Sequence, residues 1–178
     1  MTLPRAFDAL LAKPRWVIWK TDSDGRKPPL SPHSGRLASA SNPRDWGTYA
    51  QAAAAVKKYR ADGIGIMLGR LDGDDYYLCG IEIDRCLNDD EVHDPTVLQV
   101  LERFNTYTEV SPSGRGLHLL FIVSPGDVDA LRQKYGIDHH KPFSRGEHQE
   151  MSLHLSTKYY TVTGDVYLSR CEIVRRKI

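Results

Sequence analysis

Short runs of hydrophobic residues, separated by polar segments, divide this chain into predicted strands and helices. Continuous or alternating apolar residues are typical of strands, whereas apolar residues that recur every three to four positions after a capping residue are typical of helices. Strands are predicted at residues 15–20, 64–68, 76–84, near 107, 117–123, 150–155 and 158–162. Helices are predicted at residues 5–12, 48–61, 95–104 and 127–135. This interleaving predicts an α/β or α+β domain.

Polar segments between these elements mark turns and one long connection. Residues 21–47 are rich in Pro, Ser, Gly and Asn, which predicts an irregular segment, and long connections of this kind are often functional. The Asp72-Gly73 pair predicts a turn that joins the strands at 64–68 and 76–84. A polar segment is expected before the strand at 150–155. We expect a single domain over residues 1–178, with about 165–178 as a C-terminal extension or the start of a linker.

Composition and charge limit the class of protein. The 178 residues suffice for one domain with a hydrophobic core, and 40% hydrophobic with 26% charged residues is ordinary for a globular protein. There is no membrane-length apolar run, no signal-peptide pattern, and the three cysteines lack disulfide or zinc-site spacing. We therefore expect a cytoplasmic protein without membrane contact. The net charge of +1 does not itself indicate nucleic-acid binding, and the basic run at 175–177 is expected to be a solvated end or linker.

The segment Gly80-Ile81-Glu82-Ile83-Asp84 places two carboxylates on a predicted buried strand. Strand side chains alternate between faces, so Glu82 and Asp84 project from one face while Ile81 and Ile83 point into a core. Two neighbouring like charges repel unless a cation lies between them, and oxygen ligands favour Mg²⁺ or Mn²⁺. The alternative is a solvated strand face, which the flanking isoleucines argue against because unpaired buried carboxylates are costly.

A turn rich in Ser and Gly precedes the predicted strand at 117–123, with the sequence Ser111-Pro112-Ser113-Gly114-Arg115-Gly116-Leu117-His118. Its glycines let backbone N–H groups approach an anion closely, and His118 adds a donor for phosphate. Taken alone, a histidine beside an apolar strand is more often a satisfied structural residue. Next to metal-binding acids, the turn suggests nucleotide chemistry.

Further segments occur along the chain in an order known from one family. They are Trp16–Lys20, Lys27-Pro28, Ser34-Gly35, Ala38-Ser39, Asn42–Gly47, Gly63–Ile66, the acidic strand, Tyr107–Gly114, Gly116–His118 and Lys158–Gly164. Together they resemble the primase-polymerase domain of the archaeo-eukaryotic primase superfamily, in the form carried by phages and plasmids. The resemblance covers nearly the whole chain. It implies a primase-like catalytic core, in which an RRM-like mixed sheet has flanking helices and an N-terminal α/β lobe.

The resemblance implies catalytic roles for Glu82, Asp84 and His118. Both acids would be metal ligands, although the family usually has Asp at the two positions, so the extra methylene of Glu82 shifts one ligand. Ser113 and His118 would contact the incoming triphosphate, whereas Arg115 occupies a variable position without a family role, and its guanidinium can still touch phosphate. The expected nucleotide-binding set is Ser113, Gly114, Arg115, Gly116, His118 and Lys158.

The third metal ligand of the family is not matched. Family members typically carry Glu nine residues before the first Thr of a Thr-x-Thr-Gly motif, and that Thr is Thr161 here. The corresponding residue is Ser152, a neutral side chain and a poor ligand for Mg²⁺, with His154 in the place of a Tyr and Lys158 in that of an Arg. Glu150 lies one alternation earlier on the same strand face and is the alternative ligand. Otherwise the third acid has been lost, by nature or by engineering.

The resemblance implies a DNA primase and DNA-directed DNA polymerase of phage or plasmid replication. Such an enzyme transfers nucleotides from (d)NTPs on a DNA template and primer, with two Mg²⁺ or Mn²⁺ ions, and a replicative helicase domain or protein is an expected partner. Lys27 is a candidate contact to phosphate or template, or else a solvated lysine. Two alternatives stay open: a catalytically degenerate domain that binds nucleotide or single-stranded nucleic acid, and a metal-dependent nuclease, which would not need a triphosphate cradle.

Overall fold

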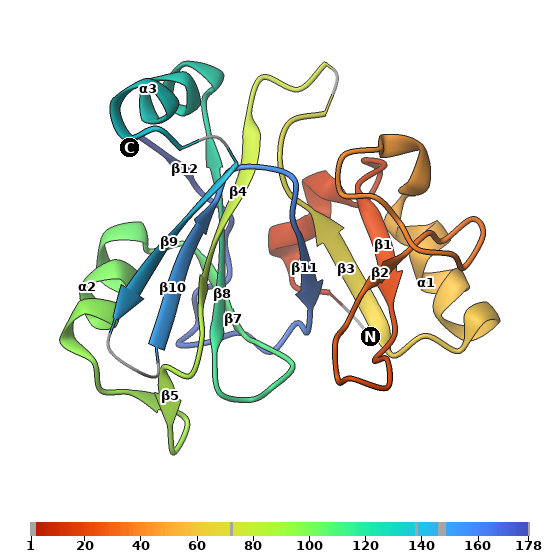
Figure 1. The fold of residues 1–178 in the computed structure, drawn as a ribbon, viewed down its shortest axis with the longest axis horizontal. Helices are drawn as coiled ribbons and strands as arrows, with labels where there is room; N and C mark the ends of the chain where they lie inside the picture. Colours follow the sequence, from red (N-terminus) through yellow and green to blue (C-terminus); the bar gives the residue numbers. More distant parts are fainter. Residues whose placement is uncertain (1–2, 72, 138, 146–148, 178) are drawn as a thin grey trace.

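The computed structural model describes residues 3–71, 73–137, 139–145 and 149–177, which form two sheets side by side (Figure 1). The smaller sheet is antiparallel, with the strand order β11–β3–β1–β2. Its strands are β1 (Trp16–Trp19), β2 (Pro29–Leu30), β3 (Gly63–Met67) and β11 (Tyr159–Val162). Helix α1 (Tyr49–Tyr59) and the 3-10 helix η1 (Arg5–Leu10) pack on it. The long connection 21–47 holds β2 and a short 3-10 helix, η2 (Pro43–Asp45).

The larger sheet has the order β12–β8–β4–β10–β9, and β7 also pairs with β8. All of these pairs are antiparallel except β12 with β8, so the sheet is mixed. Its strands are β4 (Tyr77–Ile83), β7 (Tyr107–Val110), β8 (Leu117–Val123), β9 (His140–Arg145), β10 (Gln149–His154) and β12 (Arg175–Arg176). The remaining elements are the hairpin of β5 (Leu87–Asn88) and β6 (Glu91–Val92), and helices α2 (Pro95–Phe104) and α3 (Pro125–Tyr135).

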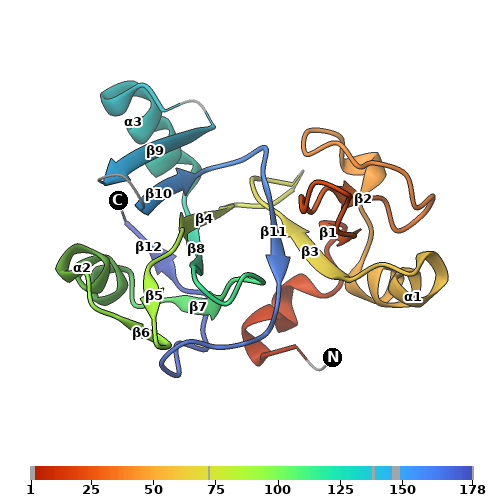
Figure 2. The ribbon, with the colours of Figure 1, turned by 60° about the horizontal axis from the view of Figure 1, so that its bottom comes forward.

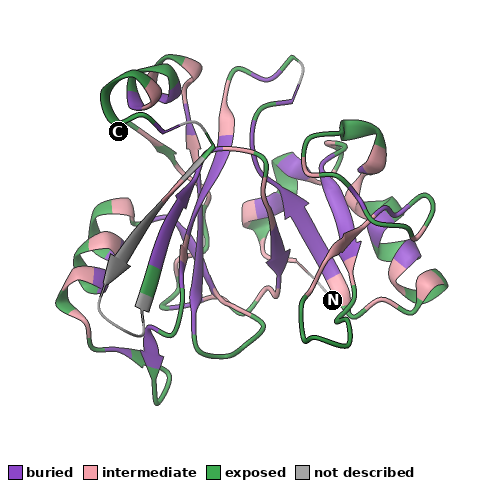
Figure 3. Ribbon diagram, in the orientation of Figure 1, coloured by how far each residue is buried: buried purple, intermediate pink, exposed green. Residues whose placement is uncertain are grey.

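The two faces of the larger sheet have different partners. On one face Ile81 and Ile83 of β4 belong to a buried cluster with Leu101 of α2 and Val128 of α3. On the other face Leu120 belongs to the cluster formed by the smaller sheet. Strand alternation therefore turns Glu82 toward the smaller sheet, whose edge strand β11 lies between β3 and the larger sheet (Figure 2). Figure 3 shows buried positions along the central strands of both sheets.

Local capping explains where the helices begin. The Thr48 side chain accepts from the backbone N–H of Gln51 and forms a capping box with it, so α1 starts at the next residue. Asp94 accepts the N–H of Thr96 at 2.7 Å and is followed by a proline, and α2 has the predicted bounds 95–104. Helix α1 ends at Tyr59, two residues before the predicted end at residue 61, because the C-cap residue Arg60 adopts a left-handed conformation with φ 52°.

Three segments that the sequence predicted as connections or ends have more structure than expected. The polar segment expected before residue 150 contains strand β9, which pairs with β10. Residues from 165 onward, expected as a C-terminal extension or the start of a linker, pack against the rest of the domain. Val166 bridges to Glu109, β12 pairs with β8, and the Arg176 Nε donates to the Phe104 carbonyl at the end of α2 (2.6 Å). Within the basic run at 175–177, Arg175 and Arg176 belong to β12, and Arg175 and Lys177 are exposed.

The predicted turn between the strands at 64–68 and 76–84 does not create a hairpin. Strands β3 and β4 belong to different sheets, and an isolated bridge between Gly69 and Leu78 joins the segments near them. Asp72 of that turn lies outside the described residues. Within the described part of the chain, no helix is both long enough and apolar enough to cross a membrane.

Candidate active site

A row of polar side chains crosses the larger sheet on the face that looks toward the smaller one. The strand registers put Glu109 of β7 opposite His118 of β8, His118 opposite Glu82 of β4, and Glu82 opposite Ser152 of β10. Directly opposite residues in antiparallel strands are within interaction distance. Four strands, β4, β7, β8 and β10, therefore contribute to one line of polar groups.

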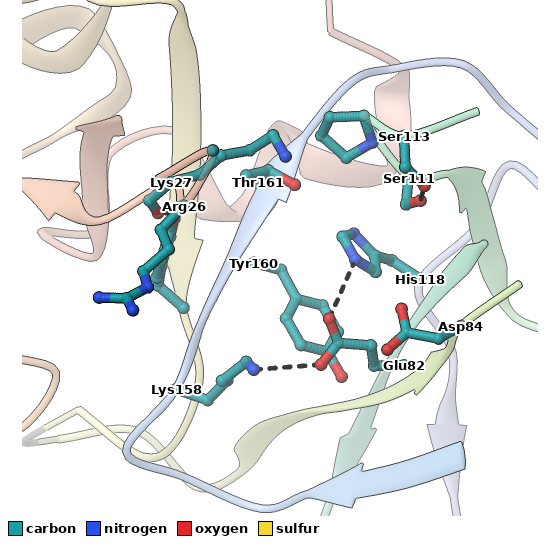
Figure 4. A pocket seen from close by; sticks show the side chains of 13 residues that line it. Arg26, Lys27, Glu82, Asp84, Ser111, Ser113, His118, Lys158, Tyr160 and Thr161 are labelled. Atoms are coloured by element: carbon teal, nitrogen blue, oxygen red, sulfur yellow. Dashed lines mark hydrogen bonds and ion pairs between the residues drawn. The ribbon is translucent and has the colours of Figure 1, made fainter. Parts of the chain in front are cut away.

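This row opens into a cavity of about 290 Å³ between the two sheets. Figure 4 shows that Glu82, Asp84 and His118 come from the larger sheet, while Arg26 and Lys27 lie on the other side of the cavity, in the connection before β2. The lining residues are Gly25, Arg26, Lys27, Glu82, Asp84, Ser111, Pro112, Ser113, His118, Lys158, Tyr159, Tyr160 and Thr161. The cavity thus brings acidic groups of one sheet against basic groups of the other.

Glu82 is surrounded by nitrogen atoms. Its carboxylate oxygens lie 3.8 Å from His118 Nε2, 3.4 Å from His154 Nε2 and 3.1 Å from Lys158 Nζ. Burial alone would raise the pKa of Glu82, but the contacts with the two histidines and the lysine outweigh it and hold this pKa well below its usual range. Glu82 is therefore ionised, and an added cation would compete with these nitrogens for it.

Asp84 has the opposite electrostatic surroundings. Partial burial raises its pKa, and the negative charges of Glu82 and Glu150 raise it further. Crowded carboxylates of this kind are stabilised by a divalent cation, and the oxygens of Asp84, Glu82 and Glu150 are of the ligand type that Mg²⁺ or Mn²⁺ prefers. In the described residues, however, no three His, Cys, Asp or Glu side chains already surround one point as metal ligands.

His118 is buried between two carboxylates. Its Nε2 faces Glu82 at 3.8 Å and its Nδ1 faces Glu109 at 3.7 Å, distances that correspond to charge contacts rather than formed hydrogen bonds. Burial lowers the pKa of His118, but Glu109 and Glu82 outweigh this effect and raise it to about 9. At neutral pH the imidazole is therefore a cation at the cavity wall, which suits an anionic ligand.

An aromatic ring supports His118 from the side of the smaller sheet. Tyr160 of β11 stacks on the imidazole with ring centroids 4.6 Å apart, and it meets His154 edge-on at 5.8 Å. The ring fits because β4 has a glycine at position 80, where a Cβ would overlap Tyr160. Gly80 thus admits the side chain that fixes the plane of His118.

The serine and glycine turn contributes unequally to the cavity. Of the residues predicted in this turn, Ser113 lines the cavity. Ser111 lines it as well, and its Oγ lies 3.0 Å from Ser113 Oγ. Gly114 (φ +72°) and Arg115 are exposed, and Gly116 packs so closely on the Ile83 carbonyl that a Cβ would be only 2.8 Å from it. These three residues shape the turn, but they are not among the described residues that line the cavity.

The two candidate third acids differ in exposure. Ser152 is 5% exposed, stands opposite Glu82, and donates from Oγ to Glu150 Oε1 at 3.2 Å. Glu150 is exposed, and its backbone carbonyl accepts the Asp84 N–H at 2.8 Å. Neither side chain is among the described lining residues, so both lie at the margin of the cavity.

Several residues of the site were not assigned by sequence reasoning. Glu109, His154, Tyr160 and Arg26 contact the candidate residues or line the cavity. For Glu109, the sequence signal was an acidic residue within a short, mostly buried strand. This signal indicates a functional residue only once the strand register is known to pair Glu109 with His118.

Comparison with known proteins adds one finding to this geometry. No protein-family model matches the chain. The chain is 33% identical over 174 residues to the DNA primase-polymerase of Nitratiruptor phage NrS-1, an alignment that covers 97% of the chain and 22% of that relative. The chain thus spans about a fifth of the length of the relative that it matches. Identity at this level across nearly all of its residues supports a primase-polymerase domain of the phage type.

Proposed function

We propose that this domain is a DNA primase and polymerase that performs nucleotidyl transfer in phage or plasmid replication. The observation that carries the proposal is the cavity in which two ionisable acids, Glu82 and Asp84, lie beside the cations of His118 and Lys158. Acids of this kind suit a metal ion, and the cations suit the phosphates that it accompanies. The name of the phage relative supports the same reaction class.

The basic side chains would bind the triphosphate of an incoming (d)NTP. His118 and Ser113 lie on the larger sheet's side of the cavity, and Lys158 precedes β11. Lys27 lines the opposite wall, where its backbone carbonyl accepts a hydrogen bond from the Tyr159 hydroxyl. Phosphoryl and nucleotidyl transfer depend mainly on positioning and charge stabilisation, which such a ring of donors supplies.

Asp84, Glu82 and Glu150 would hold Mg²⁺ or Mn²⁺. When bound, such ions lower the pKa of the attacking hydroxyl and neutralise charge on the leaving pyrophosphate. The neutral Ser152 leaves one acid fewer than the family pattern, so a second ion would bind poorly. We infer a weak polymerase in which Glu150 supplies part of the missing charge.

The DNA template and primer would bind near the smaller sheet. Residues 1–61 contain eleven lysines and arginines but only four aspartates and glutamates, although the whole chain carries a net charge of only +1. Lysine and arginine contacts to phosphates supply most of the sequence-independent affinity for DNA. This distribution supports template or primer contact through that part of the domain. A replicative helicase partner remains an expectation from the family.

A specific observation favours a second candidate function. Glu82 already has three nitrogen partners and position 152 lacks an acid, which would also suit a domain that binds nucleotide without polymerising. Such a domain would bind dNTPs through His118 and Lys158 but would not extend a primer. The metal-dependent nuclease is less favoured, because cleavage of a phosphate backbone needs no triphosphate pocket.

Primer extension distinguishes these candidates. A labelled primer on a single-stranded template is incubated with dNTPs and either Mg²⁺ or Mn²⁺, using the unmodified chain, Asp84→Asn, Glu150→Ala and Ser152→Glu. Glu102→Gln, an exposed position on α2, is the matched control. We expect weak extension that Asp84→Asn and Glu150→Ala abolish and Ser152→Glu increases.

Three other results would change the assignment. Extension that survives Asp84→Asn would contradict the proposed acids. Binding of dNTPs without extension, even in Ser152→Glu, would favour the nucleotide-binding domain. Shortening of the primer would favour the nuclease.

A further inference from the structure

A buried carboxylate stands behind His118, on the side away from the cavity. Glu109 of β7 is 1% exposed. Its Oε2 accepts the Tyr107 hydroxyl at 2.8 Å and the backbone N–H groups of Thr163 and Gly164 at 3.1 and 3.0 Å. A buried carboxylate is costly unless it is hydrogen-bonded in this way, so these donors stabilise Glu109 in its buried position.

These donors come from both sheets. Tyr107 belongs to β7 of the larger sheet, whereas Thr163 and Gly164 directly follow β11 of the smaller one. The Thr163 hydroxyl also donates to the Val110 carbonyl at 2.8 Å. Glu109 therefore lies where the end of β11 is tied to the larger sheet, and its position is fixed from two directions.

The two oxygens of Glu109 have different surroundings. Oε2 receives all three donors named above, and Oε1 shares the Thr163 N–H at 3.2 Å. Oε1 is also the atom that faces His118 Nδ1, at 3.7 Å, across directly paired strands. A carboxylate has about four lone-pair sites, so Oε1 retains capacity for the imidazole N–H.

We propose that Glu109 is a positioning residue that keeps Nδ1–H of His118 turned toward β7 and so leaves Nε2–H directed at the cavity. The partner of one imidazole nitrogen determines how the ring is oriented and which task the other nitrogen performs. Tyr160 holds the plane of the ring, and Glu109 favours the one of the two ring flips about Cβ–Cγ that places Nδ1 toward β7. The inference deepens the proposed function, because Nε2 is the atom that would meet the triphosphate.

A double-mutant cycle on the full chain tests this role. The affinity for dATP with Mg²⁺ is measured by calorimetry for the unmodified chain, Glu109→Gln, His118→Ala and the double variant, and Glu102→Gln serves as the control for loss of one negative charge. We expect Glu109→Gln to weaken binding about tenfold, the usual effect of removing the partner that orients a histidine. We expect no further loss when Glu109→Gln is added to His118→Ala, because Glu109 acts only through His118.

Unchanged affinity in Glu109→Gln, or a loss that persists fully in the His118→Ala background, would overturn the positioning role. Full affinity in His118→Ala would instead contradict the proposed function, so the two failures are distinguishable.

If Glu109→Gln does not fold, substitutions of His118 decide the question. The amide nitrogen of glutamine reaches the place of Nε2, and that of asparagine reaches the place of Nδ1. We expect His118→Gln to retain at least tenfold tighter dATP binding than His118→Asn, and equal or reversed affinities would overturn the proposal.

Discussion

The substitution Ser152→Glu should make the stability of the domain depend on a divalent cation. Ser152 is 5% exposed, lies directly opposite Glu82, and donates a hydrogen bond to Glu150. A glutamate there loses that donor and adds a third carboxylate beside two others. Like charges directly opposite each other in a sheet repel, and a buried charge without a partner is destabilising.

The size of the effect follows from these two terms. A broken hydrogen bond to a charged group and an uncompensated charge together lower the free energy of unfolding by about 2–3 kcal/mol in the absence of metal. For a domain of this length 1 kcal/mol corresponds to about 2–4 °C in melting temperature. We therefore expect a decrease of roughly 4–12 °C in EDTA. Mg²⁺ at a hundredfold excess over its Kd adds about 2.7 kcal/mol, which would restore most of the loss.

The assay is thermal unfolding in EDTA and in Mg²⁺, with Ser152→Gln as the control of similar size and no charge. Ser152→Gln should lose stability through packing but gain no more from Mg²⁺ than the unmodified chain. The reasoning is refuted if Ser152→Glu melts like the unmodified chain in EDTA, or if its gain from Mg²⁺ equals that of Ser152→Gln. Either result would mean that position 152 does not face the acids closely enough to share a cation.

Three further predictions concern His118 and its neighbours. His118→Ala should weaken dNTP binding by about 1–3 kcal/mol, the value of a charge-assisted hydrogen bond, and unchanged affinity in calorimetry would return His118 to a structural role. Because its pKa is raised to about 9, the stability that the imidazolium contributes in metal-free buffer should be complete below about pH 6.5 and lost as the pH rises through about 9. In pH-dependent denaturation, His118→Ala should lack this loss of stability. A stability profile identical to that of the unmodified chain would contradict the raised pKa of His118. Gly80→Ala should destabilise the domain by about 1–3 kcal/mol because its Cβ overlaps Tyr160. In the control Gly126→Ala the new Cβ would lie 4.0 Å from the Ser124 Oγ, an ordinary contact, so this variant should not be destabilised.

The parts of the fold that local sequence determines were predictable. Helix α2 follows from Asp94 and the proline after it, and strand β8 follows from an uninterrupted apolar run between residues 117 and 123. Strand β12 could not be predicted, because its two residues become a strand only through pairing with β8. Strand β9 similarly depends on β10, since its own sequence lacks a clear alternation.

The same distinction applies to the site. Alternation along β4 was enough to predict that Glu82 and Asp84 share a face, since both depend on one strand only. The partners of Glu82 could not be predicted in this way. His154 and Lys158 reach it from β10 and the connection that follows, and Glu109 reaches His118 from β7. Each of these contacts depends on the register between strands, which a single sequence does not specify.

The division of charge between the two sides of the cavity indicates which ligand it suits. The larger sheet contributes Glu82 and Asp84, whereas Lys27 lies in the connection between β1 and β2 of the smaller sheet and Lys158 directly precedes β11 of that sheet. A triphosphate alone would be repelled by the acids, and a divalent cation alone would be repelled by the lysines. A metal–triphosphate complex carries both charges and can contact both sides at once. We therefore infer that metal and nucleotide bind with positive cooperativity, since each removes the repulsion that opposes the other.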